Sequence, residues 1–345
     1  MRSLFLLNSL CFGGAEKQVV ALVNGLCQQN GHRVWIQCLK DDDALLPQVD
    51  PALRPQVLPN LHVRSGLEPF AVAALARRID AHAIDVVVCT NMYALLYGSL
   101  ARALCRRRNA LRLVEVFHTT EVASRKERLS MTLYRRLLRA TDLLVYVCRG
   151  QAAHWQAQGL RAREEVVIHN GIDTARFTDR STPAENEALR RSFGFSPEDF
   201  VVGICAVMRP EKAHDDLVRA VAALHARGVP VRALLVGDGP LRGAVEARIA
   251  ELGLTASIRI TGLVADVRPY VAACDAMALT SRTETFSLAA LEAMAMGKPM
   301  VMARIGGAAE QVDDGVDGLL YPPGDVAALT DALGAMADRA RCAAM

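Results

Sequence analysis

The stretch Ser281-Arg-Thr-Glu284-Thr-Phe-Ser-Leu-Ala-Ala-Leu-Glu292-Ala-Met-Ala-Met-Gly297-Lys-Pro299 holds two carboxylates around the expected start of a helix. The apolar run Ala276–Thr280 before it predicts a short strand, and Gly297-Lys-Pro299 is typical of a helix end. The first backbone N–H groups of a helix have no partner within it, so a strand–loop–helix unit favours an anion at the helix start. Glu284 in the loop and Glu292 on the helix can accept hydrogen bonds from sugar hydroxyls. The pattern therefore indicates a nucleotide-sugar pocket, and an amphipathic helix with two solvated glutamates is the competing interpretation.

The residues after this stretch favour the pocket. Met300–Ala303 predicts the next buried strand, and Gly306-Gly307-Ala-Ala-Glu310 is a second glycine-rich turn behind it. Open α/β sheets bind ligands at the carboxyl ends of neighbouring strands. We therefore expect these two loops to line one binding site.

Strand-like apolar runs alternate with helical segments along the whole chain. The expected strands are Ser3–Asn8, Val34–Leu39, Asp85–Cys89, Arg112–Phe117, Leu143–Val147, Val166–Ile168, Val201–Val207, Arg232–Val236, Ser257–Ile260, Ala276–Thr280 and Met300–Ala303. The expected helices cover approximately 15–29, 93–105, 126–139, 213–227, 241–252, 266–273, 286–296 and 324–337. Repeated βα units predict parallel sheets with right-handed crossovers.

The length and one polar junction predict two domains. A chain of 345 residues is long enough for two separate cores. The stretch Asp173–Glu198 is rich in charge and contains two prolines, so we expect it to join the domains and to carry a surface helix. The expected fold is α/β, with Rossmann-like, doubly wound parallel-sheet domains at 1–172 and 173–345 that face a cleft.

The composition favours buried parallel strands, and the cysteine pattern favours a reducing compartment. Hydrophobic residues make up 52% of the chain and aromatic residues only 5%, and no apolar run reaches the roughly 18–20 residues that span a bilayer. The apolar start of the chain runs into Gly13-Gly14, which is typical of a first strand and its turn rather than of a signal peptide. Nine scattered cysteines without a Cys-x-x-Cys pair favour a reducing, cytoplasmic location and disfavour a zinc site.

The net charge of +3 conceals an asymmetry between the two halves. Residues 1–172 carry 22 of the 40 Lys and Arg and 14 of the 37 Asp and Glu, a balance of +8, so the other half (18 against 23) has −5. Such a basic half is expected to meet an anionic partner. Its arginines concentrate in Arg102–Arg112 and Arg125–Arg139. The second segment is expected to be an amphipathic helix, which either lies on an anionic membrane or is an ordinary exposed helix. Nucleic acid is disfavoured because no aromatic residues interleave these charges.

Three further turns follow predicted strands. Lys212, in Arg209-Pro-Glu-Lys212, lies near a helix start and can neutralise a leaving diphosphate, with a solvated turn as the alternative. Gly13-Gly14 opens a helix, although no dinucleotide fingerprint is present. Gly237-Asp-Gly-Pro240 is a turn that is also expected to wall the nucleotide.

Two polar motifs belong to the first half. His118, in His118-Thr-Thr-Glu121, follows a strand and is a candidate for contact with the reacting sugar, and a structural histidine is the alternative. Asp41-Asp42-Asp43 resembles a metal-binding run, but it has no partner cluster and is interpreted as solvated. No Ser/His/Asp or Cys/His triad is evident.

With these residues in place, the chain resembles the retaining glycosyltransferases of family GT4, which have the GT-B fold. The resemblance runs nearly end to end, and its most specific part is Glu284-x7-Glu292 with the Ala-Met-Ala-x-Gly-x-Pro tail. The other matching segments are Gly13-Gly-Ala-Glu16, His118, Val167-Ile-His-Asn170-Gly-Ile-Asp173, Arg209-Pro-Glu-Lys212, Gly237-Asp-Gly-Pro240 and Gly306-Gly-Ala-Ala-Glu310.

The resemblance implies catalytic roles for Glu284, His118 and Lys212. Glu284 and His118 would contact the donor sugar, and Glu292 would hold the ribose. The diphosphate would be bound by Lys212 and by backbone N–H groups at the helix start. The donor-binding set that the resemblance and the turns imply is Gly14, Arg209, Lys212, Gly237, Thr285, Phe286, Ser287, Leu288 and Glu292.

The chain departs from the family pattern in three places. Val207 stands where the family often has arginine, so Arg209 would supply that charge from a shifted position. Thr285 and Ser287 stand where glycines are usual. The family usually continues beyond residue 337 with a segment that crosses back to the first domain, and this crossover is expected to be missing here.

The sequence therefore predicts an enzyme that moves a sugar from a nucleoside-diphosphate sugar, with UDP favoured and GDP possible, to an acceptor hydroxyl. No cofactor and no metal are implied, because Lys212 and the helix start supply the positive charge. A glycan or lipid-linked acceptor, in lipopolysaccharide or exopolysaccharide synthesis at the inner face of a membrane, fits the basic first half. A nucleotide-sugar epimerase with the same fold and a non-catalytic nucleotide-binding module are the alternatives.

Overall fold

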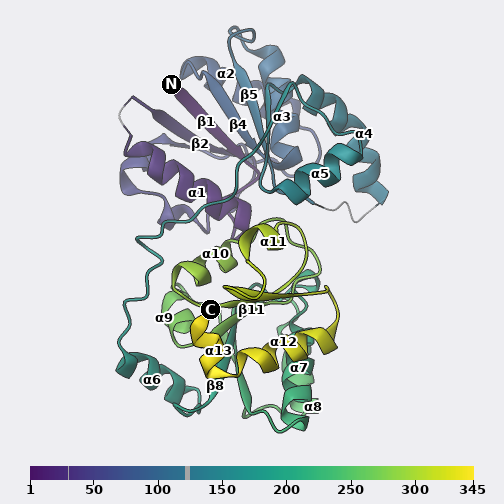
Figure 1. Ribbon diagram of the computed structural model, residues 1–345. Helices are drawn as coiled ribbons and strands as arrows, with labels where there is room; N and C mark the ends of the chain where they lie inside the picture. Colours follow the sequence, from purple (N-terminus) through teal and green to yellow (C-terminus); the bar gives the residue numbers. More distant parts are fainter. Residues whose placement is uncertain (30, 121–124) are drawn as a thin grey trace. The chain divides into compact units, whose positions relative to one another are not determined.

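The computed structural model describes residues 1–29, 31–120 and 125–345, without the side chains of 125–130. The chain divides into two compact units, Met1–Gly171 and Ile172–Met345, next to the boundary predicted after residue 172. Each unit is built around one parallel sheet (Figure 1). The predicted α/β class with two parallel-sheet domains is confirmed.

A parallel sheet forms the centre of the N-terminal unit, with seven strands among its described residues. Across the sheet the strands are β3 (Val57–Leu58), β2 (Arg33–Cys38), β1 (Arg2–Leu7), β4 (Val86–Thr90), β5 (Arg112–Phe117), β6 (Leu143–Tyr146) and β7 (Glu164–Val167). The strand order reverses direction between β1 and β4. In doubly wound sheets such a switch point leaves room for a ligand at the carboxyl ends of the two strands.

Helices cover both faces of this sheet. They are α1 (Gly14–Cys27), α2 (Pro69–Ala81), α3 (Asn91–Leu104), α4 (Arg125–Ala140) and α5 (Arg149–Ala157), with the 3-10 turns η1 (Leu46–Gln48) and η2 (Pro51–Gln56). Leu4 and Leu6 of β1 pack into the core under α2 and α3, whereas Phe5 and Leu7 pack under α1. Alternate residues of one strand point to opposite faces, so a strand that is apolar throughout requires cover on both sides.

The C-terminal unit repeats this plan. Across its sheet the strands are β10 (Ile258–Gly262), β9 (Val231–Val236), β8 (Phe200–Cys205), β11 (Ala276–Leu279), β12 (Met300–Ala303) and β13 (Gly318–Tyr321). Here the order reverses between β8 and β11, which pair in parallel. The loops after β8 and β11 therefore lie at the switch point of this sheet.

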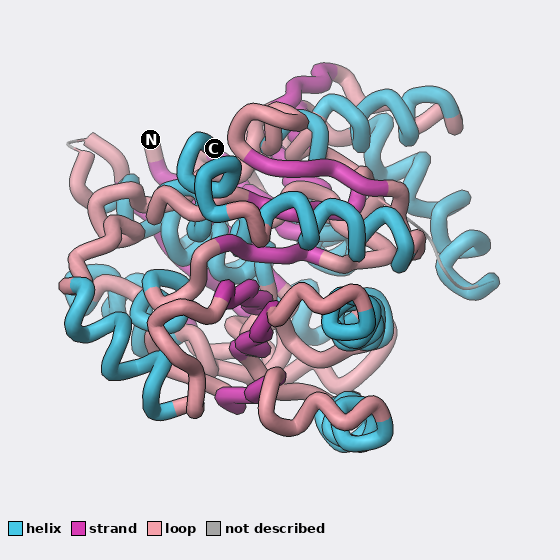
Figure 2. The backbone as a smooth tube through the Cα atoms, turned by 60° about the horizontal axis from the view of Figure 1, so that its bottom comes forward, coloured by secondary structure: helices cyan, strands magenta, loops and turns pink. Residues whose placement is uncertain are grey.

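The helices of the C-terminal unit also lie on both faces of the sheet (Figure 2). They are α6 (Pro183–Ser192), α7 (His214–Ala226), α8 (Arg242–Glu251), α9 (Arg268–Ala272), α10 (Leu288–Ala295), α11 (Ala308–Gln311), α12 (Val326–Met336) and α13 (Arg339–Ala344), with the 3-10 turn η3 (Pro210–Lys212). One core contains residues of α7, α8 and α12, and the other contains residues of α9, α10 and α11. None of the described helices combines the length and the apolar character that crossing a bilayer requires.

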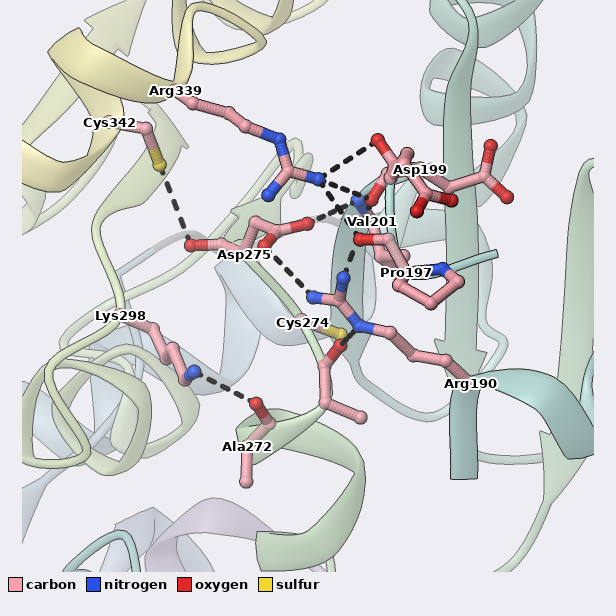
Figure 3. A network of polar contacts seen from close by, with 12 residues as sticks. Arg190, Pro197, Asp199, Val201, Ala272, Cys274, Asp275, Lys298, Arg339 and Cys342 are labelled. Carbon is pink, nitrogen blue, oxygen red and sulfur yellow. Dashed lines mark hydrogen bonds and ion pairs between the residues drawn. The ribbon is translucent and has the colours of Figure 1, made fainter. Parts of the chain in front are cut away.

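A polar network anchors α6 and α13 at the amino ends of β8 and β11 (Figure 3). Asp275 accepts hydrogen bonds from the Val201 N–H at 2.7 Å and from Arg190 of α6 at 2.9 Å. Arg339 of α13 donates to the backbone carbonyl of Asp199 at 3.1 Å. These contacts fix the end of the sheet opposite the loops after β8 and β11.

Most predicted elements are present, with bounds shifted by one or two residues. The segment predicted as a helix from 286 begins at Leu288, because Ser287 is its N-cap and has extended backbone angles. Among the described residues, six α-helices and β-strands were not predicted, namely β3, α2, α5, α11, β13 and α13, and the 3-10 turns η1, η2 and η3 were not predicted either. Glu121, part of the His118 motif, lies outside the described residues.

Candidate functional site

The switch point of the C-terminal sheet brings Lys212 and Glu284 into contact. Lys212 ends η3 in the loop after β8, and Glu284 lies in the loop after β11. Lys212 Nζ donates to Glu284 Oε2 at 2.5 Å, across 72 residues of sequence. The two side chains are 24% and 18% exposed, so the ion pair is only partly screened by water. The structure thus places both predicted catalytic residues of this unit in one group.

Glu284 keeps one oxygen available. Its Oε2 accepts from Lys212 and, at 3.4 Å, from the Ser281 hydroxyl. Its Oε1 has no hydrogen bond with any residue that the structure describes, and the Lys212 ammonium has three donors. The pair can therefore bind a ligand that presents both an anion and a hydroxyl group.

The start of α10 lies directly after Glu284. Ser287 caps the helix with its hydroxyl, which accepts from the Ala290 N–H at 3.3 Å. The Ser287 N–H itself donates to Gln311 Oε1 at 3.0 Å, and Gln311 Nε2 donates back to the Ser287 carbonyl at 2.8 Å. The Ser287 N–H was predicted to bind phosphate, but in this structure it is hydrogen-bonded to Gln311. Leu288 is the first residue of α10, and its N–H has no acceptor within the helix.

The second glycine-rich turn supports the Glu284 loop. Gly306 has φ of +52°, and a Cβ on it would lie 2.0 Å from the Glu284 carbonyl oxygen. The Gly307 N–H donates to the Thr285 carbonyl at 2.7 Å. Only glycine permits both the left-handed backbone and this approach. The predicted neighbourhood of the two loops is present, with the second loop acting as backing for the first.

Three further donor-binding candidates occupy different places. Arg209 is exposed at the start of η3, and its side chain makes no ion pair within the described part of the chain. Glu292 lies half-buried on α10, one turn after Leu288. Gly237 has φ of +143°, and a Cβ on it would lie 2.2 Å from the Ala206 carbonyl oxygen. This close packing explains the glycine at 237 without a ligand.

In the N-terminal unit, the glycine turn lies at the carboxyl end of β1. Gly13 caps α1 and Gly14 is its first residue. A Cβ on Gly13 would lie 2.1 Å from a Glu16 carboxylate oxygen, whereas a Cβ on Gly14 would meet nothing within 4 Å. Burial raises the pKa of Glu16. Within its own unit, a side chain at 13 would meet only the movable carboxylate end of Glu16, and packing leaves the predicted site residue Gly14 unconstrained.

His118 lies at the carboxyl end of β5 in the same unit. Its backbone N–H donates to Asn91 Oδ1 at 3.2 Å. Burial lowers the pKa of His118 to about 4, because it disfavours the charged imidazolium. The ring is therefore neutral at pH 7 and can act as a hydrogen-bonding group rather than as a cation.

The three aspartates at 41–43 are exposed to solvent. Asp41 pairs with His62 at 2.8 Å, and both side chains are more than half exposed. The side chain of Asn60 donates to Asp43 at 3.2 Å. Across the described residues, no three His, Cys, Asp or Glu side chains gather in a group that could hold a metal ion.

Sequence reasoning missed four residues that shape the site: Ser281, Arg282, Asp216 and Gln311. Arg282 Nη2 lies 2.9 Å from the carboxylate of Asp216, which is buried on α7. Ser281 and Arg282 stand within the stretch quoted above, so their proximity to Glu284 was a usable signal. The sequence around Asp216 and Gln311 contains no such signal, because each residue contacts the Glu284 loop only after the chain has folded.

Comparisons with known proteins identify related sequences along most of the chain. The family model described as "Glycosyltransferase Family 4" matches residues 12–176, and the model described as "Glycosyl transferases group 1" matches residues 199–339. A GDP-mannose-dependent alpha-(1-6)-phosphatidylinositol monomannoside mannosyltransferase of Mycolicibacterium smegmatis is 32% identical over 81% of this chain and 74% of its own length. A 2-deoxystreptamine glucosyltransferase of Streptomyces kanamyceticus is 28% identical over 84% of this chain and 79% of its own.

A solved structure resembles the whole chain. Anabaena Alr3699/HepE in complex with UDP and glucose has a TM-score of 0.84 and 27% identity. The match covers 100% of this chain and 92% of that one. The GT-B class of the two domains is confirmed by such neighbours.

Proposed function

Because the chain belongs to glycosyltransferase family 4, the group 1 glycosyltransferases, we propose that it transfers a sugar from a nucleoside-diphosphate sugar to an acceptor hydroxyl with retention at the anomeric carbon. The proposal favours UDP as the nucleotide and leaves GDP as the second candidate. Support for UDP comes from the Anabaena protein, which was solved with UDP and with UDP-glucose. Support for GDP comes from the mannosyltransferase relative, which is described as GDP-mannose-dependent.

The contact between Lys212 and Glu284 is the observation that carries this proposal. Breaking the bond between the sugar and the diphosphate leaves negative charge on the phosphate oxygens. Lys212 and the first N–H groups of α10 supply positive charge to that leaving group, so the proposal requires no metal. Glu284 Oε1 would accept a hydrogen bond from a hydroxyl of the donor sugar.

The remaining candidates receive binding roles. Glu292 would accept hydrogen bonds from the two ribose hydroxyls, and exposed Arg209 would add charge near the diphosphate. Gly14 would allow close approach of its loop to the phosphates. Neutral His118 would hydrogen-bond the sugar or the acceptor. The leaving phosphate would take the acceptor proton, as the family resemblance implies.

Replacing Glu292 by alanine is expected to weaken nucleoside-diphosphate binding about 10- to 100-fold. A hydrogen bond to a charged acceptor contributes about 1.5–3 kcal/mol, which corresponds to that range of affinity. Calorimetry with UDP, GDP, ADP, NAD and the sugar conjugates on wild type and variant measures it. Glu187→Ala, on exposed α6 of the same unit, is the matched control and should bind as wild type does.

Two results would contradict the donor-site assignment. One is the failure of wild type to bind any of these nucleotides. The other is equal binding by wild type and the Glu292→Ala variant. Product analysis with and without an extract of lipid-linked acceptors then separates transfer from epimerisation, because an epimerase changes the donor sugar when no acceptor is present.

We further propose that the acceptor is a glycan or lipid-linked molecule of cell-surface glycan synthesis, and that the chain works in the cytoplasm, peripherally on an anionic membrane. The surplus positive charge of the first half supports this. Arg102 and Arg112 pair with Asp142, and Arg107 pairs with Asp85. The arginines at 106 and 108 are exposed, and their side chains make no ion pair with described residues.

Membrane binding is expected to depend on lipid charge. The protein should sediment with vesicles that contain phosphatidylserine at low salt and remain in solution with phosphatidylcholine vesicles. Each basic residue near such a surface contributes about 1 kcal/mol, so Arg106→Ala with Arg108→Ala should weaken binding about 10- to 30-fold. Equal recovery with both vesicle types would exclude the charged-surface proposal.

A further inference from the structure

Two loops carry the Lys212–Glu284 pair, and their backbones are bonded to each other. We define the Lys212 loop as residues 206–213 and the Glu284 loop as residues 280–287. The Arg282 N–H donates to the Glu211 carbonyl at 2.7 Å. The Thr280 hydroxyl donates to the Lys212 carbonyl at 2.8 Å and lies 3.1 Å from the Ala213 carbonyl oxygen. The two loops therefore hold a defined register.

A second ion pair joins the same segments with the charges reversed. Lys212 and Asp216 stand one helical turn apart, at η3 and on α7, whereas Arg282 and Glu284 both stand in the Glu284 loop. Arg282 Nη2 donates to Asp216 Oδ1 at 2.9 Å. The Asp216 side chain is 5% exposed and the Arg282 side chain 43%. Each segment thus contributes one cation and one anion, and a shift of register would bring like charges closer together.

The guanidinium of Arg282 also lies against the backbone of Gly324. A Cβ on Gly324, which follows β13, would lie 2.0 Å from Arg282 Nη1. A cavity of about 400 Å³ between α7 and α8 is lined by Arg282 and Asp216, and its lining includes neither Lys212 nor Glu284. The second ion pair therefore faces a different space from the first.

From this geometry we infer that Asp216 and Arg282 are positioning residues for the transfer reaction, an inference that rests on the proposed function of Lys212 and Glu284. They fix the loops so that the Lys212 ammonium and the Glu284 carboxylate meet the diphosphate and the sugar at the correct separation. Removing the guanidinium leaves a buried carboxylate without its partner and frees one side of the Glu284 loop. A misplacement of about 1 Å in a catalytic group can cost about 100-fold in rate.

Kinetics of the full chain test this inference. Arg282→Ala is expected to lower kcat about 10- to 100-fold while changing the donor KM and the nucleotide Kd less than about threefold. Arg282→Lys should recover part of the loss because it keeps the charge. In a Lys212→Ala background, Arg282→Ala should add less than about a twofold effect, because it acts through Lys212. Full multiplication of the two effects would overturn the inference.

Hydrogen exchange of the backbone provides a readout that does not need turnover. Arg282→Ala is expected to speed exchange in residues 206–213 and 280–287 and to leave β8 and β11 unchanged. Arg227→Ala is the matched control, because it removes another Arg–Asp pair, which joins the C-cap of α7 to Asp331 of α12 at an exposed position. Wild-type exchange in both loops of the Arg282→Ala variant would overturn the inference. If wild type turned over no donor, the proposed function would fail. The exchange rates of wild type and Arg282→Ala would still show whether Arg282 holds the two loops in place.

Discussion

Replacing either Lys212 or Glu284 by alanine is expected to lower kcat by about 10²- to 10³-fold while the protein remains folded. Removing one preorganised group that stabilises charge in a transition state typically costs this much. Lys212→Ala removes the ammonium that faces the leaving diphosphate. Glu284→Ala removes the sugar contact and also leaves the ammonium without its 2.5 Å partner.

The two substitutions are expected to combine by much less than the product of their separate effects. Residues that act as one unit are strongly non-additive in kinetics, because the loss of one disables the other. Turnover is measured as nucleoside-diphosphate release in the presence of the acceptor extract, with the nucleotide chosen by the binding panel. Circular dichroism and thermal unfolding establish that each variant is folded.

Two control variants remove the same kinds of charge, one anion and one cation, at positions away from the Lys212–Glu284 site. Glu187→Ala removes a partly exposed glutamate of α6, and Arg227→Ala removes an exposed cation at the end of α7. Both should retain wild-type kcat. Wild-type turnover by both the Lys212→Ala and the Glu284→Ala variants would refute the site.

Replacing Glu115 by glutamine is expected to stabilise the N-terminal unit increasingly as pH rises. Glu115 lies on β5 with its side chain fully buried. Neither carboxylate oxygen has a hydrogen-bond partner among the residues that the structure describes. Cys89, its register partner on β4, supplies no compensating charge. Burial alone raises the pKa of Glu115 well above its usual range.

The direction of the pH effect follows from proton binding. The unfolded chain releases this proton near pH 4.5, whereas the folded chain keeps it to a higher pH. Between these two pKa values the folded state binds more protons, so the free energy of unfolding of wild type falls by about 1.4 kcal/mol per pH unit relative to the glutamine variant. Below pH 4 both states are protonated and this difference disappears.

Urea unfolding from pH 4 to pH 8 measures the effect. Both tryptophans, Trp35 and Trp155, belong to the N-terminal unit, so their fluorescence reports on this unit. Glu164→Gln, at an exposed position of β7 in the same unit, is the matched control and should follow wild type at every pH. A gap between wild type and Glu115→Gln that stays constant with pH would contradict a buried, protonated carboxyl group.

Local signals in the sequence predicted most of the fold. Apolar runs bounded by turns located the central strands, and Arg112–Phe117 and Met300–Ala303 have the predicted bounds. The elements that were missed have weak local signals. β3 is only two residues long, and it lies with η1 and η2 in a proline-rich stretch that resembles a loop. α5 carries glutamines and a histidine between its apolar residues, which obscures its buried face.

The site could be predicted in part for the same reason. Glu284 and Lys212 each follow a strand and precede a helix, so their position at a sheet edge is encoded locally. The bond of Ser287 to Gln311 is not, because it joins residues 24 apart through the turn at Gly306. The pairing of Arg282 with buried Asp216 spans 66 residues and likewise has no signal in either segment.

Local sequence signals are enough to predict a tandem of βα units with charged loops at strand ends, because hydrophobic period and turn residues act over a few positions. Which of these loops meet depends on the packing of the whole C-terminal unit. The order of the C-terminal sheet reverses between β8 and β11, and this reversal places Lys212 against Glu284. Strand order results from burying both faces of the sheet under helices from distant parts of the chain. That packing is a property of the whole unit, and no single segment of the sequence contains it.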